Sequence, residues 1–396
     1  MNNRSRREFL RMSGLATAGT MLVPQFLKAF EKPFGQEGNR ILIVLQLSGG
    51  NDGLNTIVPY RNDIYYQSRP KIAVRPEKVL KVSDELGFNS ALEKLRSIFD
   101  QGYLSILNNV GYPNPDRSHF RSMDIWQSAS GAKDYLNTGW IGRYLDANCD
   151  GMAHNAIEID DTLSLALKGN AIKSMAMKDP EKLYRATHNP LFKEVAENQP
   201  SDSDPLVSYL YKTAAETVSS AAYLYDQIKV YKPMAEYPKT EFGSRLKTIG
   251  TLINSGVDAK VYYASLSGFD THTNQTAQQE KLLTIYAEGV TSLLRDLEKQ
   301  GNLERTLILT FSEFGRRVSE NASQGTDHGT ANNLFIMGKN LKQPGFFNGT
   351  PNLRNLDEGD LLYQIDFRSV YATVLKQWMG DSSKILRQDF PTLGFI

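Results

Sequence analysis

Three of the five histidines in this chain, His119, His272 and His328, lie in loops that follow short apolar segments. Each lies within two residues of an aspartate or a serine, whereas the other two histidines do not. Asp270 precedes His272 by two positions, so on an extended backbone both side chains point to the same side. A carboxylate and an imidazole on one side can share an ion. The pattern predicts a site for a divalent metal ion.

Other loops of the same kind carry further candidates. Segment 48–55 combines glycines, which permit a tight backbone, with the carboxylate of Asp52, which could also simply cap a turn. Segment 111–120 brings Arg117, Ser118 and His119 to the start of a helix, where Ser118 could equally be an N-cap. Segment 312–317 supplies Glu313 and Arg316.

The elements that must position these loops alternate along the chain. Apolar runs of strand length lie at 40–47, 104–108, 156–159, 261–266, 307–311 and 334–337. Helical stretches lie at 89–101, 120–128, 206–227, 242–255, 276–300 and 367–378. This alternation predicts an α/β fold, with a mostly parallel central sheet covered by helices on both faces. Ligands of such sheets gather beyond the carboxyl ends of the strands. The polar segment from about 168 to 251 interrupts the alternation and predicts a helical cap insertion.

Composition excludes several classes of protein. The net charge is +1, from 45 basic and 44 acidic residues, so nucleic acid is not an expected partner. No apolar run is long enough to span a membrane in the mature chain. Cys149 is the only cysteine, which excludes an intrachain disulfide and a cysteine-based zinc site. The nucleophile elbow, the phosphate-binding loop, the zincin motif and the dinucleotide fingerprint are all absent from the sequence.

The N-terminus predicts export. Ser5-Arg-Arg-Glu-Phe-Leu10 is followed by a mildly apolar stretch at 12–23, which is typical of a twin-arginine signal, although a basic, solvated N-terminus is the alternative. We therefore expect a signal at 1–30, a linker at 31–39 and one α/β domain at 40–396. The expected partner is the twin-arginine translocase, and the expected location is periplasmic or extracellular.

Five motifs together resemble the exported family called domain of unknown function 1501. They are Ser48-Gly-Gly-Asn-Asp-Gly-Leu-Asn55, Arg117-Ser-His-Phe120, Phe269-Asp-Thr-His272, Ser312-Glu-Phe-Gly-Arg316 and Asp327-His-Gly329. That family is similar to the alkaline phosphatase superfamily, which includes sulfatases. The resemblance implies a three-layer alkaline phosphatase-like sandwich. It also implies hydrolysis of a phosphate or sulfate ester with one or two divalent ions, such as zinc, manganese or calcium.

Site roles follow from the resemblance residue by residue. Asp52 resembles the ligand that bridges metal and nucleophile, and Ser118 resembles the attacking hydroxyl. Asp270, His272 and His328 would form one metal site. Glu313 lies where the superfamily has a ligand Asp followed by His.

Two further roles are hypotheses from chemistry. Arg117 or Arg316 could bind the anionic ester, although any single arginine can equally make a surface ion pair. His119 could shuttle the proton of the leaving group.

Two departures from the superfamily keep a second class of function open. Phe314 follows Glu313 where the superfamily has His, which puts a second metal site in doubt, and Asn274 lies where another His would be. A non-catalytic exported binding or scaffold protein on the same fold is the alternative. The 19 tyrosines could line a glycan groove, so the anionic ester could belong to a glycan, although packing explains most of these residues.

Overall fold

The computed structural model describes residues 40–171, 173–190, 192, 205–229, 231–381 and 384–396. The expected signal at 1–30 and the linker at 31–39 lie outside the described residues. No helix in the described part of the chain combines the length and the apolar character that crossing a membrane requires.

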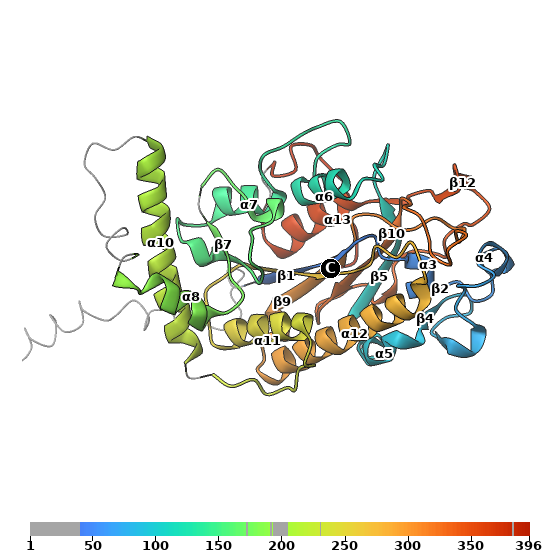
Figure 1. The fold of residues 1–396 in the computed structure, drawn as a ribbon, viewed down its shortest axis with the longest axis horizontal. Coiled ribbons are helices and arrows are strands. Elements are labelled where there is room, and N and C mark those ends of the chain that lie inside the picture. Colours follow the sequence, from blue (N-terminus) through green and yellow to red (C-terminus); the bar gives the residue numbers. More distant parts are fainter. Residues whose placement is uncertain (1–39, 172, 191, 193–204, 230, 382–383) are drawn as a thin grey trace, which may run out of the picture. The chain divides into compact units, whose positions relative to one another are not determined.

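The centre of the fold is a nine-stranded sheet (Figure 1). Its order is β11 (Gly345–Phe346), β5 (Leu104–Gly111), β10 (Asn332–Met337), β9 (Thr306–Phe311), β1 (Ile41–Ser48), β8 (Val261–Ser267), β6 (Ala156–Glu158) and β7 (Ser174–Ala176), with β14 (Ile365–Asp366) also paired to β5. Among these strands only β10 runs antiparallel to its neighbours. The predicted mostly parallel sheet is confirmed.

Strand β1 explains why the sheet needs cover on both faces. Its side chains alternate between two separate hydrophobic clusters, with Ile43 and Leu45 in one and Leu42 and Val44 in the other. In register, Val44 lies between Tyr263 of β8 and Leu309 of β9. A strand that is apolar on both faces must be buried on both faces.

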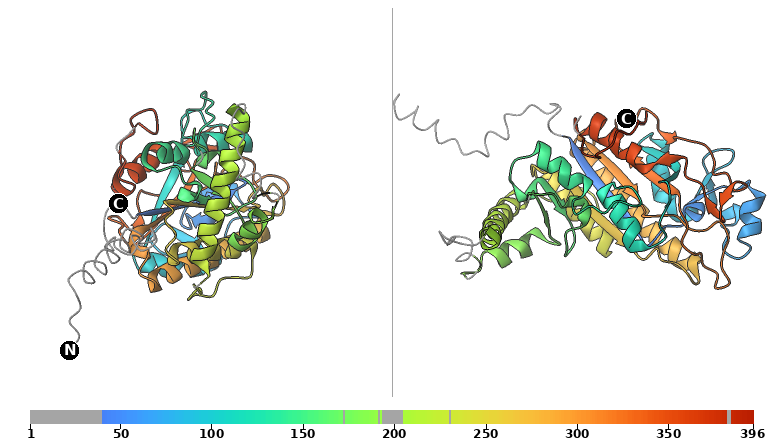
Figure 2. Two further views of the ribbon diagram at one scale, coloured as in Figure 1. Left: turned by 90° about the vertical axis from the view of Figure 1, so that its left-hand side faces the viewer. Right: turned by 90° about the horizontal axis from the view of Figure 1, so that it is seen from above.

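Helices supply that cover in two layers (Figures 1 and 2). Apolar residues of α5 (Glu93–Asp100), α11 (Glu241–Asn254) and α12 (Gln275–Lys299) belong to the cluster on one face. Those of α6 (His119–Ser128), α7 (Trp140–Asn148) and α13 (Phe367–Thr373), which continues as a π-helix at Val374–Trp378, belong to the cluster on the other. The predicted three-layer α/β fold is confirmed.

Segment 168–251 contributes to several parts of the fold. It supplies the edge strand β7, the helix α11 of one layer, and between them α8 (Pro180–Thr187) and α10 (Pro205–Ile228), which contact each other. Figure 1 shows α8 and α10 at the end of the sheet opposite α3 (Gly53–Thr56), the short helix that follows β1.

Smaller elements surround the other end of the sheet. They are α4 (Asp63–Ser68), the three-stranded sheet of β2 (Ile57–Val58), β4 (Gly87–Asn89) and β3 (Val79–Lys81), and the hairpin of β12 (Leu356–Asp357) and β13 (Asp360–Leu361).

Candidate metal centre

Three imidazoles converge on one carboxylate oxygen at the carboxyl ends of the strands. The Oδ1 atom of Asp270 lies 3.3 Å from Nε2 of His119, 3.0 Å from Nε2 of His272 and 3.2 Å from Nε2 of His328. Asp270 and His272 follow β8, His119 begins α6 in the connection after β5, and His328 lies in the loop between β9 and β10. The fold therefore brings together three loops that are distant in sequence.

The other ring nitrogen of each histidine faces an oxygen. Nδ1 of His119 lies 3.0 Å from Oε1 of Glu313, and Nδ1 of His328 lies 2.7 Å from the carbonyl oxygen of Arg117. Nδ1 of His272 lies 3.3 Å from Oδ1 of Asp327. Histidines that bind metal characteristically donate their second N–H to a carboxylate or a backbone carbonyl.

These contacts determine which tautomer His119 and His328 adopt in their neutral form. A carbonyl or carboxylate oxygen can only accept, so Nδ1 of His119 and of His328 carries the hydrogen. Each Nε2 then points a lone pair at the anionic Oδ1 of Asp270, which is unfavourable without a cation between them. Consistent with this, Nε2 of His119 is a buried atom without a hydrogen-bond partner among the described residues.

The spacing of these atoms fits a bound ion. Ligand atoms of His119, Asp270 and His328 all lie within 4.8 Å of one another. Around a tetrahedral zinc ion with bonds of about 2.0–2.1 Å, ligand atoms lie roughly 3.3 Å apart. Nε2 of His272 lies 3.0 Å from Nε2 of His328, so it adjoins the same group. The described residues thus contain a possible His/Asp metal site.

Arg316 holds Asp270 in place. Its guanidinium is buried and donates to Oδ1 of Asp270 at 2.8 Å, and also to the carbonyl oxygens of Gly49, Gly50, Phe269 and Thr326. Burial by itself raises the pKa of the Asp270 carboxyl, but the hydrogen bond and the positive charge of Arg316, together with the contact with His328, outweigh it and hold the pKa well below its ordinary value. Asp270 is therefore an anion at any physiological pH.

The two flanking imidazoles differ in their proton affinity. The hydrogen bond to Glu313 raises the pKa of His119, whereas burial lowers the pKa of His328.

Phe314 packs directly against this group. Its ring centroid lies 4.8 Å from those of both His119 and His328. Gly50 makes room for the ring, because a Cβ at that position would lie 2.3 Å from Cε2 of Phe314, and its φ of +74° also favours glycine.

Asp52, which the sequence suggested as a metal ligand, contacts other side chains in the structure. Its carboxylate is buried and pairs with Nη1 of Arg69 at 2.6 Å, and it also accepts a hydrogen bond from Gln275 at 2.5 Å. We attribute the difference to Arg69, whose guanidinium is itself fully buried and needs an anion.

Glu313 contacts Nδ1 of His119, on the side of that ring opposite the converging Nε2 atoms. Its Oε1 accepts from the backbone N–H of Gly49 at 2.7 Å as well as facing His119. We therefore interpret it as an orienting partner of that imidazole.

Arg117 and Ser118 lie at the edge of the group. Ser118 precedes α6, is exposed, and its hydroxyl makes no capping hydrogen bond. The guanidinium of Arg117 pairs with the buried carboxylate of Asp360 and remains 36% exposed. Roles for Asp360 and Arg69 were not predicted from the sequence, and Asp327 was predicted only as part of the motif around His328.

The architecture defines an α/β protein with a mostly parallel sheet between two layers of helices. The chain belongs to the family described as protein of unknown function (DUF1501), which it matches over residues 108–387. No curated protein matches it significantly.

The solved structures similar to this chain include a sulfatase, a phosphonate monoester hydrolase and a lipoteichoic acid synthase. A sulfatase from Pseudoalteromonas sp. has a TM-score of 0.41 at 12% identity, covering 99% of this chain and 75% of its own. A phosphonate monoester hydrolase from Silicibacter pomeroyi has a TM-score of 0.41 at 11% identity, covering 90% and 76%. The lipoteichoic acid synthase LtaP from Listeria monocytogenes has a TM-score of 0.37 at 9% identity, covering 79% and 69%. These similarities concern the fold alone.

Proposed function

We propose that this chain is an exported, metal-dependent hydrolase of phosphate or sulfate esters. The observation that carries the proposal is the convergence of Nε2 atoms of His119 and His328 on Asp270, with both Nδ1 atoms committed to oxygens on the far side. This arrangement is costly without a cation and favourable with one.

The donor set narrows the identity of the ion. His119, Asp270 and His328 would hold it, and His272 is positioned to complete the group. Imidazole nitrogens suit zinc better than manganese or calcium, which favour oxygen ligands such as the carboxylate of Asp270. His119 would then be a ligand, in place of the proton shuttle suggested by the sequence.

When bound, such an ion supplies a Lewis acid that neutralises charge on an ester oxygen and lowers the pKa of a nearby hydroxyl or water. Ser118 is the proposed nucleophile, because its exposed hydroxyl adjoins the His119 ligand and is not used as a helix cap. Oδ1 of Asp116 accepts from the backbone N–H of Ser118 at 2.7 Å and thereby fixes the loop that carries it.

The two candidate arginines separate into different roles. Every described partner of the buried Arg316 guanidinium is a backbone carbonyl or Asp270, so we assign it to positioning the loops. Arg117 is partly exposed and beside the site, so it is the better candidate to meet the anionic ester.

A non-catalytic binding protein on the same fold is the second candidate. Phe314 favours it, because an apolar ring occupies the position beside Glu313 where the superfamily carries another ligand. The two candidates differ in turnover and share the metal site.

The test combines metal content with activity. We expect the exported protein to contain zinc or manganese by elemental analysis, and to hydrolyse 4-nitrophenyl phosphate or 4-nitrophenyl sulfate. His119→Ala should lose the metal, whereas His188→Ala, a partly buried histidine outside the group, should keep it. Metal without turnover would favour the binding protein, and a protein that takes up no divalent ion would refute the site itself.

Export is part of the proposal. The paired arginines of the N-terminus support it, together with the linker that precedes β1.

A further inference from the structure

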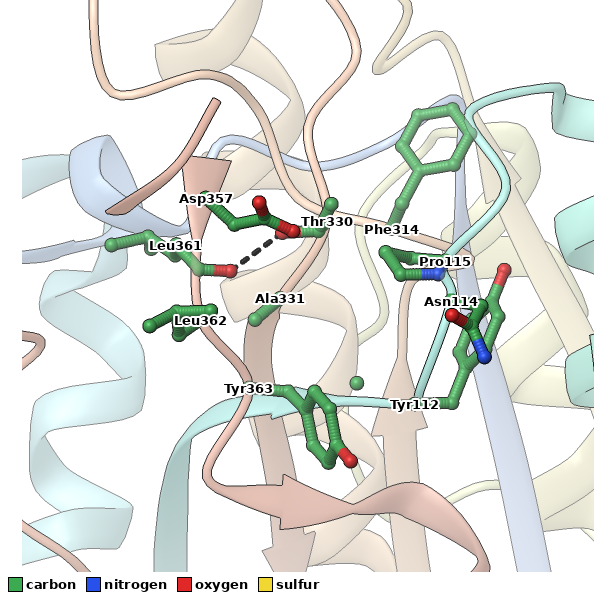
Figure 3. Close-up of a pocket in the computed structure, with 11 residues that line it drawn as sticks. Tyr112, Asn114, Pro115, Phe314, Thr330, Ala331, Asp357, Leu361, Leu362 and Tyr363 are labelled. Carbon is green, nitrogen blue, oxygen red and sulfur yellow. Dashed lines mark hydrogen bonds between the residues drawn. The ribbon is translucent and has the colours of Figure 1, made fainter. Parts of the chain in front are cut away.

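A concave pocket, shown in Figure 3, is lined by Phe314, whose ring also packs against His119 and His328 of the candidate metal centre. It encloses about 480 Å³, including the part open to solvent, and lies between the segment after β5, the β12–β13 hairpin and the start of β10. Ligand sites in proteins are typically concave and mostly apolar.

Apolar side chains dominate the pocket walls. Tyr112, Pro115, Phe314, Leu361, Leu362 and Tyr363 provide most of them. The eleven lining residues include no lysine, arginine or histidine, and Asp357 is the only charged one. Leu362 and Tyr363 each remain 40% exposed although both are large and apolar. Such exposure at a pocket mouth is typical of a surface that a ligand covers.

One side chain links the pocket to the metal centre. Phe314 lines the pocket, and its ring also lies against His119 and His328. Thr330, another lining residue, follows His328 by two positions, and its hydroxyl is committed to the carbonyl oxygen of Leu361 at 2.6 Å. A molecule whose charged end reached the imidazoles would therefore have its next group beside the Phe314 ring.

We infer that this pocket binds the uncharged, apolar ring of the ester's leaving group, so that the substrates are aryl or similarly apolar monoesters. The inference rests on the proposed function, because the charged end is assigned to the metal centre. A polyanionic leaving group does not fit, since it would face Asp357 without a cationic partner among the lining residues.

The surrounding charges support the same choice. Arg117, the proposed partner of the ester's anionic group, also pairs with Asp360, and Glu358 lies 3.9 Å from its guanidinium. The β12–β13 hairpin therefore presents carboxylates to this side of the site. These charges allow a substrate that places one anionic group at the ion and a neutral ring in the pocket.

The experiment uses pairs of non-hydrolysable ligands on the zinc-loaded, full-length protein. Phenylphosphonate is compared with methylphosphonate, and benzenesulfonate with methanesulfonate, by calorimetric titration. Because the phenyl ring is buried on binding, each aryl ligand should bind about tenfold or more tightly than its methyl counterpart.

Two substitutions at the pocket mouth sharpen the comparison. Tyr363→Ala and Leu362→Ala should reduce the aryl preference by roughly threefold or more, with methyl-ligand affinity unchanged. Tyr209→Ala and Leu210→Ala are matched controls, because both residues are exposed on α10, and they should leave the preference intact. Circular dichroism identifies any variant that fails to fold, and a crystal structure of the wild-type aryl complex locates the ring directly.

The outcomes separate the two proposals. Equal affinity for the aryl and methyl ligands, or a ring found outside the pocket, overturns the substrate inference and leaves the metal centre standing. If no ligand of either pair binds the zinc-loaded protein, the proposed function fails and the inference fails with it.

Discussion

Replacing Asp52 by Asn tests whether this carboxylate stabilises the fold or binds metal. In the structure Asp52 neutralises Arg69, and neither side chain is accessible to solvent beyond about one per cent. The variant keeps the shape of the side chain but leaves a buried guanidinium without its anion. Removing one partner of a buried ion pair typically costs about 3–5 kcal/mol. That is a large part of the roughly 5–15 kcal/mol that stabilises a typical domain.

The assay is urea denaturation followed by circular dichroism, with metal content measured on the same preparation. We expect Asp52→Asn to lose about 3–5 kcal/mol of unfolding free energy while the folded protein keeps its metal. Asp100→Asn is the matched control, because Asp100 pairs with Arg96 on the exposed face of α5 and should change stability by less than about 1 kcal/mol. Near-wild-type stability combined with lost metal would show that Asp52 is a ligand and that our interpretation is wrong.

Three other predictions address the site, the pH dependence of stability and export. His328→Ala should remove the metal together with any activity, whereas Ser118→Ala should keep the metal and lose turnover; near-wild-type hydrolysis by the serine variant would exclude it as the nucleophile. Burial raises the pKa of Glu158 from 4.5 to about 7. The contribution of this carboxyl to the free energy of unfolding is therefore complete below pH 4.5 and is lost as the pH rises through 7. Glu158→Gln should flatten the dependence of unfolding free energy on pH by up to about 3 kcal/mol, and an unchanged profile would contradict this assignment. Changing Arg6 and Arg7 to Lys should leave the precursor in the cytoplasm, as fractionation and immunoblotting would detect, because the translocase receptor distinguishes guanidinium from ammonium.

The long strands and helices were predictable from the sequence because their apolar faces are fully buried. Strand β1 is apolar at nearly every position since both of its faces are covered, and such a run is visible in the sequence. Helix α12 shows the three- and four-residue spacing of a helix with one buried face. The short strands β11 and β14 were not predicted, because two residues at a sheet edge carry no periodic signal.

The candidate site was only partly predictable, for a physical reason. Histidines in loops after parallel strands point to one edge of a sheet, so the grouping of His272 and His328 followed from the topology. The role of a carboxylate depends instead on which donor group contacts it in the folded structure. Asp52 pairs with Arg69, which is 17 residues away in sequence and belongs to none of the recognised motifs. Glu313 accepts a hydrogen bond from the backbone N–H of Gly49. Such pairings depend on loop conformation, which spacing does not encode.

These pairings also determine how many ions the site should hold. A second ion would need free carboxylates, but Asp52 is neutralised by Arg69, and Glu313 is shared between Gly49 and His119. Phe314 fills the adjoining space with an apolar ring that can coordinate nothing. Because affinity for a divalent ion depends on the number and charge of its ligands, we expect one tightly bound ion per chain. Elemental analysis after dialysis against metal-free buffer measures this ratio. A ratio of two would require Glu313 or Asp52 to leave its present partner and would refute the structural roles assigned to both.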